Sequence, residues 1–230
     1  MSALALNSGD ELYIRGNNPS GFNSSSKAYY SFKIEGDKVS CSGNIMSLID
    51  YKNLPDVIPC NYCFYELFSG CTSLITAPEL PAMTLANWCY DGMFSGCTSL
   101  TTAPELPATE LAVSCYRVMF SGCSALTTAP ELPAMTLVAS CYEYMFRDCA
   151  SLTTAPELPA TELAVNCYSN MFSGCTALTT APELPATRLA NGCYAYMFKD
   201  CTSLKAKPEL PATELAKDCY LGMFQGTSLE

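Results

Sequence analysis

The chain has 230 residues, of which 49% are hydrophobic and 15% charged, so it can bury a core and is not an intrinsically disordered chain. A net charge of −10 argues against nucleic acid and anionic membranes as partners, because both attract clustered positive charge. Histidine is absent, which excludes nucleophile–histidine catalysis and histidine-ligated metals. The sequence contains no apolar run of about 18 residues, so no membrane-spanning segment is predicted. The opening Met1–Asn7 is too short and uncharged for a signal peptide.

The first 57 residues carry no internal repeat. Residues 11–15, 27–34 and 38–41 alternate roughly between apolar and polar side chains, which predicts strands, and Gly, Asn and Pro mark turns between them. Because the ends of a solenoid need covering, we interpret 1–57 as a small β-rich N-terminal cap. An independent β-domain is the alternative. Residues 44–50 are a candidate for a first, degenerate repeat.

From residue 58 onward the sequence repeats every 26 residues, which predicts a solenoid of about seven units over 58–230. One row of phenylalanines, two rows of cysteines and one row of leucines recur at this step. They are Phe68, Phe94, Phe120, Phe146, Phe172, Phe198 and Phe224; Cys63, Cys89, Cys115, Cys141, Cys167, Cys193 and Cys219; Cys71, Cys97, Cys123, Cys149, Cys175 and Cys201; and Leu74, Leu100, Leu126, Leu152, Leu178 and Leu204.

The first part of each unit is predicted to be an α-helix. In the unit that begins at Leu111, apolar residues recur at offsets 0, 4, 5, 8, 9 and 12, which fits one face of a helix. Thr109 is placed to cap its start, and Gly122 to end it in the left-handed conformation. Asp148 and Asp200 replace that glycine in two units and tolerate the same conformation.

The second part of each unit is predicted to be extended, because Pro130 and Pro133 forbid a helix there. Strands stack about 4.8 Å apart and helices are about 10 Å thick, so the helices would take the convex side. The predicted fold is therefore an α/β leucine-rich-repeat solenoid, with 26-residue units of helix plus short strand and a parallel sheet on the concave side.

The cysteine rows indicate buried free thiols rather than a disulfide framework. Cys115 and Cys123 would lie about 12 Å apart along one helix, beyond the reach of a disulfide. The Cys60-Asn-Tyr-Cys63 pair is a weak zinc signal without a second pair, so we expect neither a metal nor a cofactor. Cys41 and Cys60 fall outside the rows, and they either bridge each other or leave an exposed thiol.

The pattern M-F-x-x-C-x-x-L, seen in Met93 to Leu100 and its copies, is followed by an extended segment and x-L-x-x-x-C-Y. It resembles the BspA-like leucine-rich repeats of bacterial surface proteins, over about residues 58–229. The resemblance implies an exported or cell-surface protein that mediates adhesion to host proteins or other cells. In place of the family's β-branched strand residues this chain has Ala-Pro-Glu-Leu-Pro, which implies a shorter or irregular strand. The family has no fixed binding residues to carry over.

Two sets of residues are candidates for binding a protein or glycoprotein ligand. A glutamate in each extended segment would form an acidic stripe, which is either a docking site for a basic partner or a solubilising edge. Large aromatic residues at otherwise polar positions are either interface anchors or packing residues. The stripe is Glu79, Glu105, Glu131, Glu157, Glu183 and Glu209, and the aromatic residues are Trp88, Tyr144 and Tyr196.

Two functions fit these features. A surface binding module is favoured by the repeats, the resemblance and the absence of a catalytic constellation, and a structural stalk that displays another domain is favoured by the near-identity of the units. An enzyme fits least, because the only recurrent carboxylates form a six-fold row and no glycine-rich phosphate loop occurs.

Overall fold

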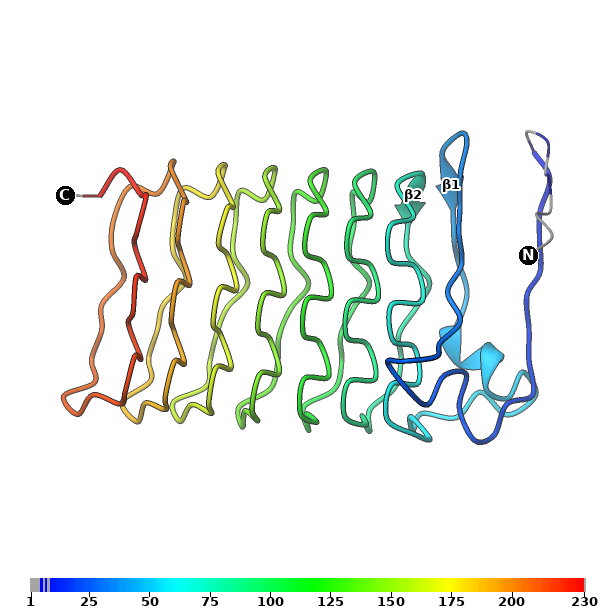
Figure 1. Cartoon of the computed structure of the whole chain (residues 1–230), viewed down its shortest axis with the longest axis horizontal. Coiled ribbons are helices and arrows are strands. Elements are labelled where there is room, and N and C mark those ends of the chain that lie inside the picture. Colours follow the sequence, from blue (N-terminus) through cyan, green and yellow to red (C-terminus); the bar gives the residue numbers. More distant parts are fainter. Residues whose placement is uncertain (1–4, 6, 8, 230) are drawn as a thin grey trace.

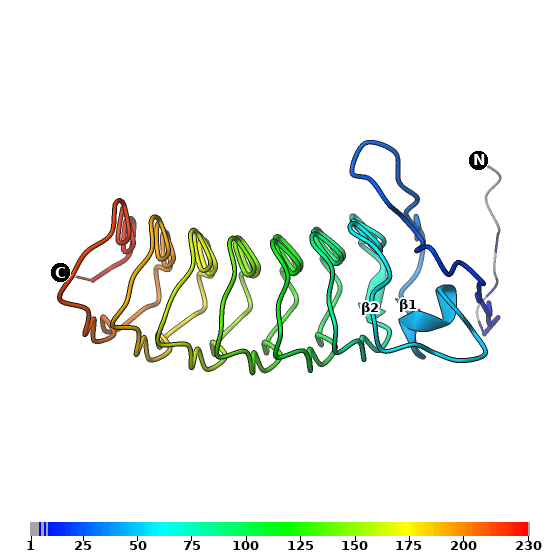
Figure 2. The same cartoon turned by 90° about the horizontal axis from the view of Figure 1, so that it is seen from below.

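The computed structural model describes residues 5, 7 and 9–229. Its coils lie side by side along the long axis, and each has a stepped wall and a smoother wall that face each other (Figures 1 and 2). The regular elements are few: strand β1 (Val39–Ser40), the 3-10 helix η1 (Ile45–Leu48) and strand β2 (Leu74–Thr76), with β1 parallel to β2. The predicted solenoid is present, but the described residues contain no α-helix.

The predicted helix is wrong: a chain of tight turns takes its place. In the coil around residue 116, Cys115 donates to the Ala112 carbonyl and Met119 to the Tyr116 carbonyl, at 3.1 and 3.3 Å. These bonds join residues three apart, as in β-turns. We call this segment the turn ribbon, and it recurs at 60–71, 86–97, 112–123, 138–149, 164–175, 190–201 and 216–227.

Every fourth residue of a turn ribbon is left-handed, and this prevents a helix. In the third ribbon these residues are Ser114, Val118 and Gly122, with φ of 53°, 58° and 74°. An α-helix needs negative φ throughout. The left-handed conformation predicted for Gly122, Asp148 and Asp200 is present, at φ of 74°, 59° and 59°, but it recurs within the segment instead of ending a helix.

Neighbouring turn ribbons are joined by backbone hydrogen bonds that all run in one direction. The amides not used in turns donate to the following coil, as Tyr116 does to Cys141 at 3.1 Å and Phe120 to Met145 at 2.9 Å. Each ribbon thus directs donors toward the C-terminal end of the solenoid and acceptors toward the N-terminal end. Because the backbone is satisfied between coils, it does not need the bonds within a segment that a helix would supply.

The opposite wall consists of extended segments such as 126–136. Single parallel bridges connect them, for example Thr102 to Thr128 and Thr128 to Thr154. Apart from the β1–β2 pair, the predicted parallel sheet is therefore reduced to isolated bridges, because prolines interrupt its ladder. With no helices on the other wall, the thickness argument that placed this wall on the concave side no longer applies.

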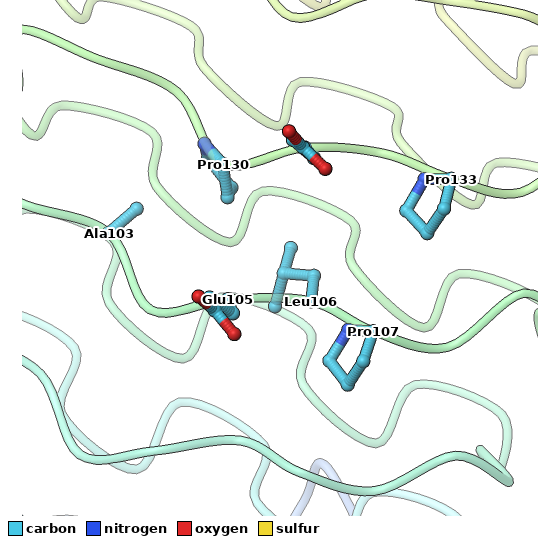
Figure 3. Close-up of a pocket in the computed structure, with 7 residues that line it drawn as sticks. Ala103, Glu105, Leu106, Pro107, Pro130 and Pro133 are labelled. Carbon is cyan, nitrogen blue, oxygen red and sulfur yellow. The ribbon is translucent and has the colours of Figure 1, made fainter.

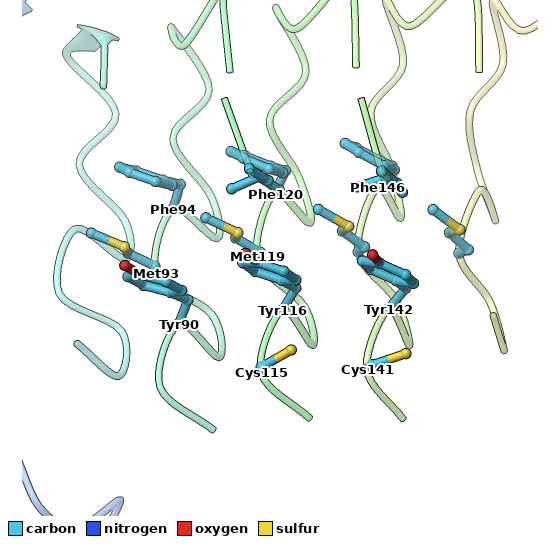
Figure 4. Close-up of a cluster of buried hydrophobic side chains, with 14 of the residues drawn as sticks. Tyr90, Met93, Phe94, Cys115, Tyr116, Met119, Phe120, Cys141, Tyr142 and Phe146 are labelled. Atoms are coloured by element: carbon cyan, nitrogen blue, oxygen red, sulfur yellow. The ribbon is translucent and has the colours of Figure 1, made fainter. Parts of the chain in front are cut away.

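Aromatic side chains from the turn ribbons stack along the interior (Figure 4). In the tyrosine row from Tyr90 to Tyr220, ring centroids lie 5.8 to 6.0 Å apart with nearly parallel planes. The phenylalanine row from Phe68 to Phe224 repeats at 5.5 to 5.8 Å. Burying each such ring contributes roughly 2 to 3 kcal/mol. The core is thus continuous from coil to coil.

The N-terminal segment lies against the first turn ribbon. Asn23 and Phe32 donate to the Cys63 and Leu67 carbonyls at 2.9 and 2.7 Å, and the Phe32 ring lies 5.2 Å from that of Phe68. Of the three strands expected here, only the third is found, as β1, so the segment is less β-rich than predicted. Of the stretch 44–50, Asn44 bridges in parallel to Glu79 and the next four residues form η1.

Candidate functional site

The six glutamates of the predicted acidic stripe are all exposed on the extended wall. The segments of the first five keep one register through threonine bridges, and Lys205 of the sixth segment donates its amide to the Thr179 carbonyl at 3.2 Å, so the carboxylates follow one another from coil to coil. Glu105 and Glu131 border a shallow depression floored by Leu106 and flanked by prolines such as Pro107 and Pro130 (Figure 3). Within the part of the chain that the structure describes, no three Cys, Asp or Glu side chains converge as a metal ion would require.

The outer face of the turn ribbons is where the coils differ. One outward row begins at Tyr62 and another at Tyr65, and a third begins at Glu66. Almost every step along these rows changes the residue type, whereas the rows of the core stay constant. The larger side chains of these rows reach solvent, and smaller members such as Ser114 and Ser169 are buried between them. In order, the three rows are Tyr62, Trp88, Ser114, Ser140, Asn166, Gly192 and Asp218; Tyr65, Asp91, Arg117, Glu143, Ser169, Ala195 and Leu221; and Glu66, Gly92, Val118, Tyr144, Asn170, Tyr196 and Gly222.

A charge ladder occupies the middle of this face. Arg117 lies between Asp91 and Glu143, at 3.5 Å and 3.2 Å. Burial raises the pKa of Asp91 to about 6, with Arg117 opposing the shift and nearby Glu66 adding to it. The sequence analysis missed Asp91 and Arg117 as partners, although their spacing of one repeat was the available signal.

The three predicted aromatic anchors lie on this same face, half-buried and left-handed. Trp88 stacks on Tyr62, with centroids 4.9 Å apart and planes 4° apart. Tyr144 lies under the Arg147 guanidinium and Tyr196 under the Lys199 ammonium, at 5.7 and 5.8 Å. Each anchor therefore already contacts a neighbour, and each keeps part of its surface in solvent.

All fifteen cysteines are free, as the sequence predicted for the two rows. Those of the second row donate their S–H to a phenylalanine carbonyl of the preceding coil, as Cys123 does to Phe94 at 3.1 Å. Cys41 and Cys60 are half-buried, and Cys60 donates to the Asn23 carbonyl at 3.0 Å. The bridge between Cys41 and Cys60 that the sequence left open is absent.

Sequence comparison identifies the repeat. Residues 61–205 and 115–230 match the BspA type leucine-rich-repeat region, in six copies. The chain belongs to the BspA-type leucine-rich-repeat family. The match covers more than half of the chain, and it indicates a repeat scaffold for protein interaction. No curated protein and no solved structure matched the chain.

The described residues contain no helix with the length and hydrophobicity needed to cross a bilayer.

Proposed function

We propose that this chain is the non-enzymatic binding module of a bacterial cell-surface or secreted protein, and that it attaches to a protein or glycoprotein of a host or of another cell. The observation that carries the proposal is the distribution of variation among the coils. The core rows and the extended wall repeat almost unchanged, whereas the outer face of the turn ribbons differs at nearly every coil. A surface that only had to be soluble would not need this diversity.

We further propose the ribbon face, rather than the acidic row, as the main binding surface. The ribbon face, by which we mean the outer face of the turn ribbons, offers Trp, Tyr and Arg side chains, which are the residue types that dominate interface centres. The six glutamates are exposed and sit at one repeated position, which favours a solvated edge. In this proposal residues 1–57 form the N-terminal cap and residues 58–230 form the binding solenoid.

The contacts of the first ribbon support the capping role. The carbonyls that this ribbon directs toward the N-terminal end accept hydrogen bonds from the cap. Asn23 donates to two of them and Phe32 to one, and the Lys33 ammonium donates to the Ser69 carbonyl at 3.4 Å. These donors stand where a preceding turn ribbon would supply its amides. The cap therefore covers the acceptor end of the solenoid.

Surface plasmon resonance against a panel of extracellular-matrix and mucosal glycoproteins tests the proposal. The first variant carries Trp88→Ser, Tyr144→Asn and Tyr196→Asn, which are residues that occupy the same rows in other coils. The second carries Glu105→Gln, Glu131→Gln and Glu157→Gln. We expect the full chain to show saturable binding. The first variant should weaken this binding at least about tenfold, because it removes one or more anchor contacts. The second variant should leave it nearly unchanged.

The opposite order of effects would assign binding to the acidic row. A chain that binds no panel protein would favour the second candidate, a stalk that displays another domain. The observation that favours the stalk is the uniform stacking of the rings, at 5.5 to 6.0 Å from coil to coil, which suits a spacer.

A further inference from the structure

Four aromatic rings form a continuous cluster at the start of the ribbon face. Tyr62 stacks on Trp88 at 4.9 Å, and Tyr65 meets the Tyr62 ring edge-on at 5.8 Å. Tyr29 of the cap contacts Tyr65 edge-on at 4.9 Å. We call these residues the aromatic cluster. The residue that follows Trp88 in its row is Ser114, which is too small to cover the indole as Trp88 covers Tyr62.

A carboxylate without a cationic partner lies beside the aromatic cluster. Glu66 accepts a hydrogen bond from the hydroxyl of Tyr29, and among the described residues it makes no ion pair. Its side chain lies over Gly92, 3.0 Å from where a Cβ would stand. The next carboxylate, Asp91, is already paired with Arg117. This end of the face therefore carries an excess of negative charge.

Elsewhere on the same face the chain places its own cations over its aromatic rings. Arg147 lies over Tyr144 and Lys199 over Tyr196, and each cation is three residues after its ring. In the first two coils the positions that match this ring and cation are Glu66 with Ser69 and Gly92 with Ser95, so neither coil has the pair. Lys33, which reaches toward the first coil, donates to the Ser69 carbonyl at 3.4 Å. Among the residues that the structure describes, no Lys or Arg side chain lies over a ring of the aromatic cluster.

We propose that the aromatic cluster and Glu66 dock a basic segment of a protein partner, with an arginine or lysine side chain over the rings and its charge directed to Glu66. The inference rests on the proposed binding function and specifies its partner. A cation over a Trp or Tyr face is attracted by the ring, and a nearby carboxylate adds to that attraction. A neutral sugar would also stack on these rings, but it would leave the charge of Glu66 unmatched.

Trp88 is the single tryptophan of the chain, so its fluorescence reports on this site directly. The full chain is titrated with a capped hexa-arginine peptide, with capped hexa-glutamate and a neutral chitin oligosaccharide as control ligands. We expect a saturable change in Trp88 emission with the arginine peptide alone. The affinity should fall with added salt, since exposed charges are screened.

Two glutamate variants separate the site from general charge attraction. Glu66→Gln keeps an acceptor for the Tyr29 hydroxyl and removes one charge, and Glu157→Gln removes one charge from the extended wall. We expect Glu66→Gln to lower the affinity for the arginine peptide about three- to tenfold, because it removes one exposed charge contact beside a ring. Glu157→Gln should have little effect on this affinity. Equal weakening by both variants would overturn the proposal, as would an emission change caused by the sugar instead.

A parallel measurement keeps this inference separate from the proposed function. The same two variants are tested against whichever panel protein binds the full chain. If Glu66→Gln does not change the affinity for the panel protein, and the arginine peptide does not change Trp88 emission, the basic-segment site is overturned. The proposed binding function would still stand in that case. A peptide response without any panel partner supports the site and counts against the adhesive function.

Discussion

The thiol of Cys123 donates a hydrogen bond to the carbonyl of Phe94, one coil earlier, at 3.1 Å. Cys97, Cys149, Cys175 and Cys201 make the same bond at 3.0 to 3.1 Å. The same carbonyl also accepts the turn bond from the Cys97 amide. This cysteine row is therefore part of the connection between coils, in addition to filling the core.

The native thiols should be nearly inert. Burial raises the pKa of Cys123 and of the other five cysteines of the second row, which keeps them protonated and unreactive. With Ellman's reagent at pH 8 we expect only Cys41 and Cys60, which are half-buried, to react in the folded chain. All fifteen should react in guanidinium. Rapid labelling of many thiols without denaturant would contradict this packing.

The left-handed positions predict opposite effects for two substitutions. Val118 is β-branched at φ 58°, where Asn170 stands two coils later at φ 55°. Val118→Asn should stabilise the chain by about 1 kcal/mol, because a β-branched residue is strained in this region. Gly122→Ala, at φ 74°, should destabilise it by about 1 kcal/mol. Its new Cβ would lie 3.6 Å from the Gly96 Cα, an ordinary contact, so the cost comes from the backbone.

Urea unfolding of both variants measures these differences. Destabilisation by Val118→Asn would show that the valine side chain contributes more through packing than its backbone costs.

Asp91 predicts a stability that depends on pH. Its folded pKa of about 6 exceeds the ordinary value of 3.8, so the folded state holds an extra proton between these values. The resulting stabilisation is complete below pH 4 and is lost as pH rises through 6. From pH 5 to pH 8 the wild type should lose about 1 kcal/mol relative to Asp91→Asn, which cannot titrate. Urea unfolding at each pH measures this difference. If the free energies of unfolding of the two proteins changed equally between pH 5 and pH 8, the assignment would be refuted.

Hydrogen exchange should distinguish the last turn ribbon from the one before it. The amides of Tyr220 and Phe224, and those of Asp218, Gly222 and Gly226, have no acceptor within the described part of the chain. The corresponding amides one coil earlier donate to carbonyls of the last ribbon, as the Tyr194 amide does to the Cys219 carbonyl at 3.0 Å. We expect rapid exchange in the last ribbon and strong protection in the preceding one. Equal protection in both would mean that the last ribbon finds acceptors of its own.

The sequence by itself determined the solenoid, its 26-residue step, the buried residues and the free thiols. These follow from which residue types recur, and recurrence does not depend on the backbone path. It also placed the left-handed residues at Gly122, Asp148 and Asp200, because few residue types tolerate that conformation. The candidate aromatic anchors were found as departures from the repeat, which needs only the register.

Only the tertiary structure decided between helix and turn ribbon. Cys115, Met119 and Cys123 recur at a spacing of four, and four residues overshoot a helical turn by about 40°, so a strict spacing of four was a faint signal against a helix. The deciding factor is the hydrogen bonding between coils, such as Tyr116 to Cys141, which exists only once the coils are stacked. For the same reason the Tyr62–Trp88 stack and the placement of Glu66 over Gly92 came from the fold: residues 26 apart meet only because the chain returns on itself.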